Sequence, residues 1–329
     1  LHVRIASLAP SVRSHFGSSH FDLSNLGQSA GYSSQFFRAE CGEGLATMAP
    51  ARELVMASTL ISFCLCGAVG NPPPAGPYAV SSSSYNLGGF LCGNREPTCN
   101  IYYPTQLGKG PFPIATFGHG MGGEIITDLT KSVASLGIVV VAPATSGGRC
   151  DDVHWKDMLH ALDGSKAKVS LHAALRHVDW NRTGIFGHSM GGFASIFAAE
   201  AALKEPKRYN VKAVLASHGY IGDATDAASK ITIPAMFATG TEDHRQAVRG
   251  QFSACPGRPK ILAQVAGAEH MEPLTHGRLN PFDAHFLGCH VAGLQSSCSK
   301  VYGNGAGSMC HANKMTTCEI TKAEMDLIV

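Results

Sequence analysis

The sequence has little net charge of either sign. Its 329 residues carry 26 Lys and Arg against 24 Asp and Glu, a formal net charge of +2, and no long basic run occurs. A weak, evenly spread charge creates no field that would gather phosphate groups, so we expect no nucleic-acid partner. With 44% hydrophobic residues, the chain still has enough apolar material for one core of ordinary size, which excludes disorder throughout.

The apolar run near the start of the chain, Leu54–Cys66, is too short for a membrane span, which needs ~20 residues. Arg52 precedes this run, and small residues follow it, with a plausible cleavage point after Ala68. This pattern predicts a signal peptide over residues 48–70 and therefore secretion, with an uncleaved signal anchor as the alternative. We expect no stable membrane insertion once the signal is removed.

Residues 1–47 are rich in Ser, contain scattered Arg and little acid, and show no sustained hydrophobic period. We expect them to lie outside the fold as an unstructured or targeting presequence. An organelle transit peptide and an artefact of the reading frame are the alternatives that the composition leaves open. One folded domain is then predicted over residues 71–329.

The C-x₂-C spacing typical of structural zinc is absent after residue 70. An even number of cysteines follows the predicted cleavage point: Cys92, Cys99, Cys150, Cys255, Cys289, Cys298, Cys310 and Cys318. This number indicates disulfides, which are typical of exported proteins. Eight cysteines allow 105 pairings, of which Cys92 with Cys99 is geometrically easy across a short turn. Residues 289–318 form a Cys-rich C-terminal tail.

From residue 76 onward, short apolar runs alternate with helix-like segments, which predicts a mostly parallel sheet with helices on both faces. Most runs are β-branched and unbroken by polar residues, as is typical of strands covered on both faces. The expected strands are 85–91 and 100–103 as an opening antiparallel pair, then 112–117, 138–142, 183–186, 211–216, 233–238 and 261–265. No internal repeat is visible.

The motif G-H-S-M-G at residues 187–191 lies between an expected strand and a helix-like segment. The bare pattern is weak evidence in a chain with 37 glycines, and an ordinary glycine-rich turn is the alternative. A sharp turn from strand to helix, however, exposes the serine hydroxyl above the sheet, while flanking glycines let the backbones approach. This placement predicts that Ser189 is a catalytic nucleophile.

Backbone N–H groups that would stabilise an oxyanion are expected at two positions. Met190 begins the helix after the nucleophile, and Met121 follows the first parallel strand, in the segment F-G-H-G-M-G-G at residues 117–123. Gly118, Gly120 and Gly123 also match a dinucleotide fingerprint, but the acidic residue that this fingerprint requires after the next strand is absent.

An acid and a histidine follow the serine in the chain order of the α/β-hydrolase fold. Asp243 comes after the expected strand 233–238 and can orient a histidine, with the adjacent Glu242 as the competitor. His270 follows the strand 261–265, which makes it the expected general base. The chain holds further histidines that we expect to line or support the site: His188, His218, His244 and His276.

Residues 76–271 resemble the bacterial cutinase and polyester (PET) hydrolase family, with chlorophyllases and dienelactone-hydrolase-like esterases as more distant relatives. The likeness begins at G-P-Y (76–78), continues through Y-Y-P-T (102–105) and A-S-L-G-I-V-V-V (134–141), and ends in G-H-S-M-G-G (187–192). It implies an α/β-hydrolase fold and a serine esterase. It also implies that Met121 and Met190 form the oxyanion hole and that Tyr220 lines the substrate cleft, although Tyr220 could equally be a core residue.

The chain departs from this family at three points. The family usually has an aromatic residue at position 121, and a methionine there removes a flat wall of the cleft, which weakens the case for polyester substrates. Chlorophyllases carry an Arg after the nucleophile, where this chain has Met190. The tail holds more cysteines than the single terminal bridge usual in the family, and it could narrow the cleft.

We therefore predict a serine carboxylic ester hydrolase with a Ser-His-Asp triad and an acyl-enzyme intermediate, which needs neither metal nor organic cofactor. Its expected substrates are cutin-like, lipid or polyester esters, presented as small molecules, lipids or a polymer surface. A chlorophyllase-like esterase, or a secreted binding module on a hydrolase scaffold that has lost its activity, is the alternative.

Overall fold

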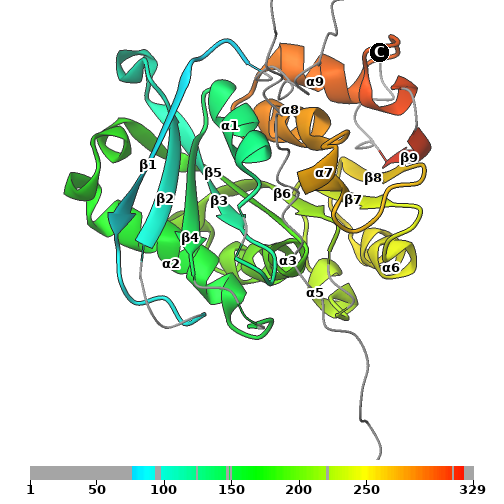
Figure 1. Ribbon diagram of the computed structural model, residues 1–329, viewed down its shortest axis with the longest axis horizontal. Coiled ribbons are helices and arrows are strands. Elements are labelled where there is room, and N and C mark those ends of the chain that lie inside the picture. The colour runs from blue at the N-terminus through cyan, green and yellow to red at the C-terminus, as the bar shows by residue number, and fades with distance from the viewer. Residues whose placement is uncertain are drawn as a thin grey trace, which may run out of the picture. The chain divides into compact units, whose positions relative to one another are not determined.

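A nine-stranded sheet runs through the residues that the computed structural model describes, which are 76–92, 98–123, 125–145, 148, 150–219, 222–312 and 315–321 (Figure 1). The strand order is β1-β2-β4-β3-β5-β6-β7-β8-β9. The strands β4, β3, β5, β6, β7 and β8 are parallel, whereas β1 and β2 at one edge and β9 at the other are antiparallel to their neighbours. The predicted mostly parallel sheet is confirmed.

The strands are β1 (Val80–Asn86), β2 (Thr98–Pro104), β3 (Phe112–Gly118), β4 (Val139–Ala144), β5 (Val178–His188), β6 (Val211–Ser217), β7 (Ala235–Gly240), β8 (Lys260–Val265) and β9 (Met315–Thr321). The α-helices are α1 (Thr127–Ser135), α2 (His154–Ala167), α3 (Met190–Leu203), α4 (Pro206–Tyr209), α5 (Thr225–Ala228), α6 (Arg245–Ala254), α7 (Glu272–Thr275), α8 (Asn280–His290) and α9 (Gln295–Tyr302). Every residue of β3, β7 and β8 is buried, as expected for strands covered on both faces.

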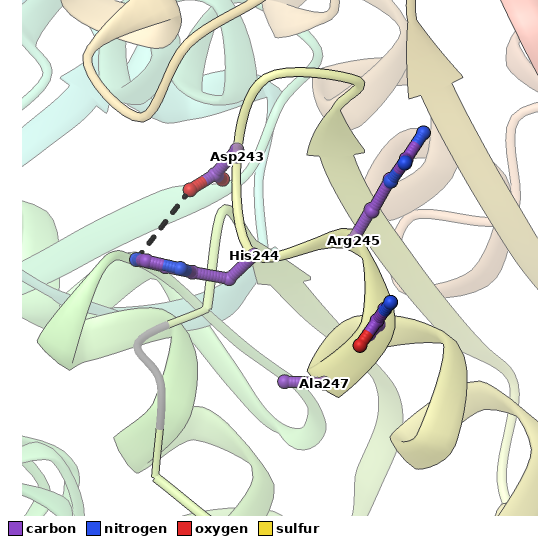
Figure 2. Close-up of a pocket in the computed structure, with 5 residues that line it drawn as sticks. Asp243, His244, Arg245 and Ala247 are labelled. Atoms are coloured by element: carbon purple, nitrogen blue, oxygen red, sulfur yellow. Dashed lines mark ion pairs between the residues drawn. The ribbon is translucent and has the colours of Figure 1, made fainter.

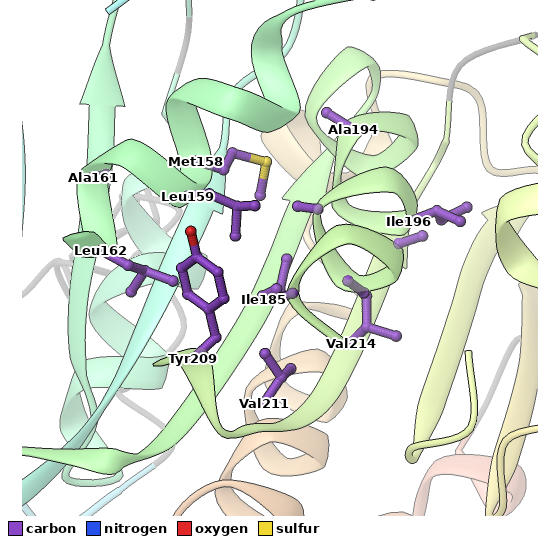
Figure 3. Close-up of a cluster of buried hydrophobic side chains, with 14 of the residues drawn as sticks. Met158, Leu159, Ala161, Leu162, Ile185, Ala194, Ile196, Tyr209, Val211 and Val214 are labelled. Atoms are coloured by element: carbon purple, nitrogen blue, oxygen red, sulfur yellow. The ribbon is translucent and has the colours of Figure 1, made fainter. Parts of the chain in front are cut away.

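The helices pack on both faces of the sheet and enclose two hydrophobic cores. One core joins the sheet to α2, α3, α5 and α6, and Figure 3 shows its part around α2, α3, β5 and β6. The other core joins the opposite face to α1, α8 and α9, which lie together in Figure 1. Because both faces are covered, the carboxyl ends of the parallel strands are where side chains of several strands can meet at the surface.

Most predicted strands match the structure within a few residues, but two features differ. The opening strand was expected at 85–91 and instead is β1, Val80–Asn86. Its serines lie on an edge strand with side chains that are exposed or half-buried, so they need not be apolar for the strand to form. The last strand, β9, was not predicted. It pairs antiparallel with β8 and places the Cys-rich tail against the edge of the sheet.

Three disulfides occur among the described residues: Cys92–Cys150, Cys289–Cys298 and Cys310–Cys318. The expected pairing of Cys92 with Cys99 is wrong. Cys99 lies within β2 with its side chain fully buried, whereas Cys92 reaches the segment after β4. Cys99 and Cys255 are free and buried, so an even cysteine count does not translate into complete pairing here.

The predicted presequence and signal peptide, residues 1–47 and 48–70, lie outside the described residues and stay predictions. Among the residues that the structure does describe, none of the helices has the length and hydrophobicity of a membrane span.

Candidate active site

Ser189 lies at a sharp turn between β5, which ends at His188, and α3, which begins at Met190. Its φ of 57° is in the left-handed region that non-glycine residues rarely adopt, so the turn is strained. The strain is maintained by close packing: a Cβ on Gly191 would lie 2.0 Å from the carbonyl oxygen of Gly118, and a Cβ on Gly187 would lie 2.4 Å from that of Gly191. The two flanking glycines of the motif are therefore required by the approach of β3, β5 and α3.

The structure brings the three predicted catalytic side chains together at the carboxyl edge of the sheet. The Oγ of Ser189 lies 2.7 Å from Nε2 of His270, and Nδ1 of His270 lies 3.0 Å from Oδ1 of Asp243. His270 follows β8 and Asp243 follows β7, so each side chain comes from the loop after a parallel strand. The serine hydroxyl, the imidazole and the carboxylate thus form a continuous hydrogen-bonded chain.

The environment of Asp243 determines its ionisation and therefore which ring nitrogen of His270 carries the proton. Its side chain is fully buried, and Thr239 donates a hydrogen bond to its second oxygen at 3.1 Å. Burial by itself raises the pKa of Asp243, but the hydrogen bond from His270, the charge interaction with His218 and the backbone hydrogen bond from His244 outweigh it and lower the pKa to about 2. Because an ionised carboxylate only accepts, Nδ1 of His270 carries the proton and Nε2 is free to accept from Ser189.

Glu242, the competitor for the acidic role, is exposed, and its Oε1 accepts a hydrogen bond from the neighbouring Thr241 at 3.2 Å. The structure therefore turns Asp243, and not Glu242, toward His270. Thr239 was not anticipated as a partner of the acid. The sequence feature that could have indicated it is its position near the end of β7, four residues before Asp243, which brings it close to the carboxylate.

The loops that carry Asp243 and His270 are fastened to each other by backbone contacts. The N–H of Glu242 donates to the carbonyl of Ala268 at 3.0 Å, and the N–H of Gly267 donates to the hydroxyl of Thr241 at 2.8 Å. Such contacts fix the separation of acid and base before any substrate arrives, which is the condition for preorganised catalysis.

His188 contacts the backbone of His270. Its side chain is buried, and burial lowers its pKa to about 4, so the imidazole is neutral at pH 7. Its Nε2 lies 3.0 Å from the carbonyl oxygen of His270 and donates to it. The predicted supporting role of His188 thus has a specific geometry: it holds the backbone, not the ring, of His270.

Of the two residues expected to supply oxyanion donors, Met190 directly follows Ser189, and Met121 follows a glycine that packs against Ser189. Met190 is the first residue of α3, where a backbone N–H has no acceptor within the helix. Gly120, directly before Met121, packs against the nucleophile: a Cβ on it would lie 3.5 Å from Cβ of Ser189. The structure thus places the residue before Met121 against Ser189, and the donor role of Met121 stays a prediction.

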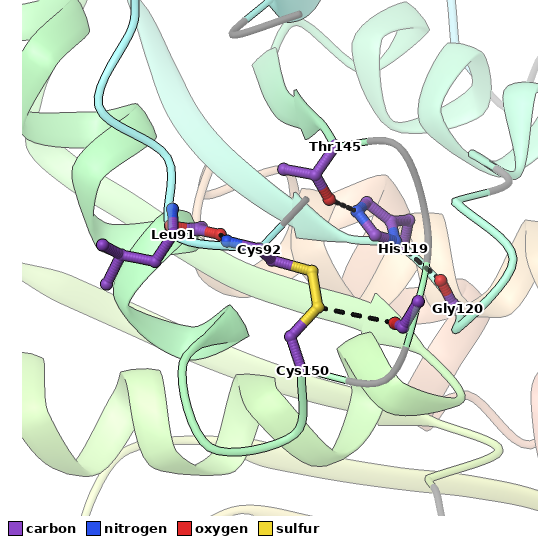
Figure 4. The surroundings of a disulfide bond; sticks show 8 residues. Leu91, Cys92, His119, Gly120, Thr145 and Cys150 are labelled. Carbon is purple, nitrogen blue, oxygen red and sulfur yellow. Dashed lines mark hydrogen bonds between the residues drawn. A yellow bond between two sulfur atoms is a disulfide. The ribbon is translucent and has the colours of Figure 1, made fainter. Parts of the chain in front are cut away.

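The loop that carries Met121 is held by contacts to the segment after β4 (Figure 4). The N–H of Gly148 donates to the carbonyl of Met121 at 2.8 Å. The ring of His119 donates from Nδ1 to the carbonyl of Gly120 at 2.6 Å and accepts at Nε2 from Thr145 at 2.5 Å. The disulfide between Cys92 and Cys150 lies next to this network and ties the segment after β4 to the loop after β1.

The other histidines expected near the site differ in burial and in their distance from His270. His218 is buried behind the site, and burial lowers its pKa to about 3. His276 is exposed on the turn after α7. His244 directly follows Asp243, with its ring 5.3 Å from that of His270. The predicted substrate residue Tyr220 lies outside the described residues and stays a prediction.

A surface pocket of about 410 Å³ opens beside the acid and is lined by Asp243, His244, Arg245, Gln246 and Ala247 (Figure 2). Few large apolar side chains are exposed in the described part of the chain, and two of them are chain neighbours of residues in this site. Met121 is 44% exposed and follows the glycine that packs on Ser189, while Met271 is 46% exposed and follows His270.

Comparison with known proteins agrees with this geometry, since residues 72–256 match the family described as PET hydrolase-like. The chain belongs to the PET hydrolase-like family. The match includes Ser189 and Asp243 and ends before His270. It confirms both the predicted family and the predicted α/β-hydrolase fold.

A curated relative of this PET hydrolase-like protein is named bis(hydroxyethyl) terephthalate hydrolase, from Streptomyces coelicolor. The two sequences are 33% identical over 132 residues, which is 38% of this chain and 40% of the relative. The matched region therefore spans less than half the length of that relative.

Asp283 in α8 gives the PET hydrolase-like domain a testable dependence of stability on pH. Burial and the nearby Glu272 raise the pKa of Asp283 from 3.8 to about 8. Since the folded pKa is raised, the folded protein keeps a proton that the unfolded chain loses between these values, so this stability contribution falls as the pH rises through that window. The stability of Asp283→Asn relative to the wild type should therefore be greater at pH 8 than at pH 5. We expect this difference to be on the order of 3 kcal/mol, which corresponds to several degrees in Tm. An equal difference in Tm from the wild type at both pH values would contradict this.

Proposed function

We propose that this protein is a serine carboxylic ester hydrolase that uses Ser189 as nucleophile, His270 as general base and Asp243 as the acid that orients the base. The observation that carries the proposal is the continuous chain of hydrogen bonds from Ser189 Oγ through His270 to the buried Asp243. Membership of a family described as PET hydrolase-like supports it.

The proposed reaction is an acyl transfer in two steps. Ser189 Oγ attacks the ester carbonyl while Nε2 of His270 takes the hydroxyl proton, and the resulting imidazolium gives that proton to the leaving alcohol. The buried Asp243 stabilises the imidazolium, because a carboxylate with a pKa of about 2 stays ionised throughout. Water then attacks the acyl-enzyme by the same route and releases the acid.

The backbone N–H groups of Met190 and Met121 are the proposed oxyanion donors. The position of Met190 at the start of α3 also aims the positive end of the helix dipole at the reacting carbonyl. Contacts of His119, Gly120 and Gly148 hold the other donor loop in place, so the two donors need little reorganisation when charge develops.

Apolar esters are the proposed substrates, within the cutin-like, lipid or polyester classes. Met121 and Met271, which directly follow Gly120 and His270 in the chain, have exposed apolar side chains that we propose contact the substrate. No metal or organic cofactor takes part in the proposed steps. A relative named for a terephthalate diester supports small diesters as a further test substrate. Secretion is the proposed location, supported by the three disulfides among the described residues.

The experiment that tests the proposal treats the full chain with a fluorophosphonate and locates the label by peptide mass spectrometry. We expect one label, on Ser189, and parallel loss of hydrolysis of p-nitrophenyl esters. A panel graded by acyl length, with bis(hydroxyethyl) terephthalate and a polyester film, then ranks the substrate classes. Labelling elsewhere, or no labelling while ester hydrolysis persists, would contradict the assignment of Ser189.

A further inference from the structure

His244 places a second imidazole beside the acid and the base, and the proposed mechanism gives it no task. Its Nε2 lies 3.7 Å from Oδ1 of Asp243, and its ring is 5.3 Å from the ring of His270. Figure 2 shows the imidazole turned toward the carboxylate at the wall of the pocket, while Arg245 points away from both. The side chain of His244 is 32% exposed, so it is in contact with solvent at the pocket.

The donor atoms of Asp243, His244 and His270 all lie within 4.8 Å of one another. Zinc bonds to imidazole nitrogen and carboxylate oxygen are ~2.0–2.2 Å long, so two ligands on one tetrahedral ion are ~3.4 Å apart. The separations here of 3.0 Å and 3.7 Å from Oδ1 bracket that value. A three-ligand His₂-carboxylate set with a fourth position left for water is a known arrangement for Zn²⁺.

We propose that Asp243, His244 and His270 form an inhibitory binding site for a divalent transition-metal ion such as Zn²⁺. The inference rests on the proposed function, because the bound ion would act through the general base. It goes beyond that function, since it assigns a metal site to a reaction that uses none.

Inhibition would follow from where the neutral ring of His270 carries its one proton. In the metal-free site, Nδ1 of His270 carries the proton and Nε2 accepts from Ser189. A metal ion on Nδ1 displaces that proton, and the neutral ring then carries its one proton on Nε2. Nε2 can no longer take the hydroxyl proton of Ser189, so the nucleophile is not activated. The ion also removes Asp243 from its role of orienting the base.

Within the described ranges, one other group of three such donors is equally compact: Cys92, His154 and Asp157. The sulfur of Cys92 is in a disulfide with Cys150 and is not available as a thiolate. The group at Asp243 is therefore the one of the two with no member in a disulfide, and His244 is the member that the proposed catalytic chain itself does not require.

The test measures hydrolysis and metal binding in parallel, in the wild type and in His244→Gln, which keeps a polar side chain of similar reach. We expect ZnCl₂ to inhibit the wild type reversibly, with full recovery in EDTA. Each protein is compared with its own metal-free rate, and the Zn²⁺ concentration for half inhibition should rise at least about tenfold in His244→Gln. His177→Gln, a change of the same kind in the segment before β5, should leave that concentration unchanged.

Calorimetric titration supplies a readout that does not depend on activity. The wild type should bind one Zn²⁺ more than His244→Gln, and Co²⁺ in its place should give the visible absorption of a four-coordinate ion in the wild type alone. Equal stoichiometry in the two proteins, or equal sensitivity to inhibition, would overturn the metal site while leaving the esterase assignment intact. An inactive protein that still shows the difference in stoichiometry would overturn the esterase and keep the metal site.

Discussion

Ser189→Ala is expected to lower kcat for a p-nitrophenyl ester by a factor on the order of 10⁶, because no other group can attack the carbonyl. The methyl group fits where the hydroxymethyl group was, so the strained turn between β5 and α3 is retained. Substrate binding should survive, since the apolar contacts and the backbone donors do not involve the hydroxyl. Single-turnover and steady-state kinetics on the purified variant measure both effects.

The thermal stability of Ser189→Ala is the control that separates a loss of activity from a loss of folding. We expect the Tm of Ser189→Ala to stay within a few degrees of the wild type, since the hydroxyl makes one hydrogen bond and the side chain stays buried. Ser299→Ala removes an exposed hydroxyl from α9 and should leave kcat unchanged. A Ser189→Ala variant that retains more than about 1% of the wild-type kcat would show that another residue is the nucleophile.

The sequence predicted the carboxyl edge of the sheet well because buried parallel strands carry a strong local signal. Short, mostly apolar runs mark the ends of β5, β7 and β8, and the loop that follows each of these parallel strands must lie at the same edge of the sheet. Ser189, Asp243 and His270 could therefore be placed together without knowledge of any distance. The parallel topology thus predicts that the three side chains lie close together, which the motif around Ser189 alone does not.

Contacts between distant segments were beyond the sequence. Cys92 pairs with Cys150 over a separation of 58 residues, and nothing in the local spacing favours that partner over Cys99. The strand β9 was missed as well: its seven residues include strand-favouring Thr and Ile but no continuous apolar run, and it lies in the sheet through its pairing with β8. The choice between Asp243 and Glu242 also depended on which carboxylate the turn after β7 directs inward.

Asp243→Asn is the second large effect that we expect, with kcat lowered by a factor on the order of 10⁴. An amide can donate to Nδ1 of His270, which the carboxylate cannot, so the ring can place its proton on Nε2. In that tautomer Nε2 points a proton at Ser189 Oγ, over the same 2.7 Å contact, and cannot act as a base. The full burial of Asp243 strengthens the effect, because no water replaces the lost charge beside the imidazolium.

Glu242→Gln is the matched control, since it makes the same chemical change one residue earlier in the chain. Its carboxylate is exposed and contacts the hydroxyl of Thr241, so we expect kcat to stay within about twofold of the wild type. Steady-state kinetics of the two variants at one pH separates the roles of the neighbouring acids. If Glu242→Gln lost activity while Asp243→Asn kept it, the loop after β7 would have to turn the other carboxylate inward during catalysis, and the hydrogen bond between Asp243 and His270 would belong to a resting state.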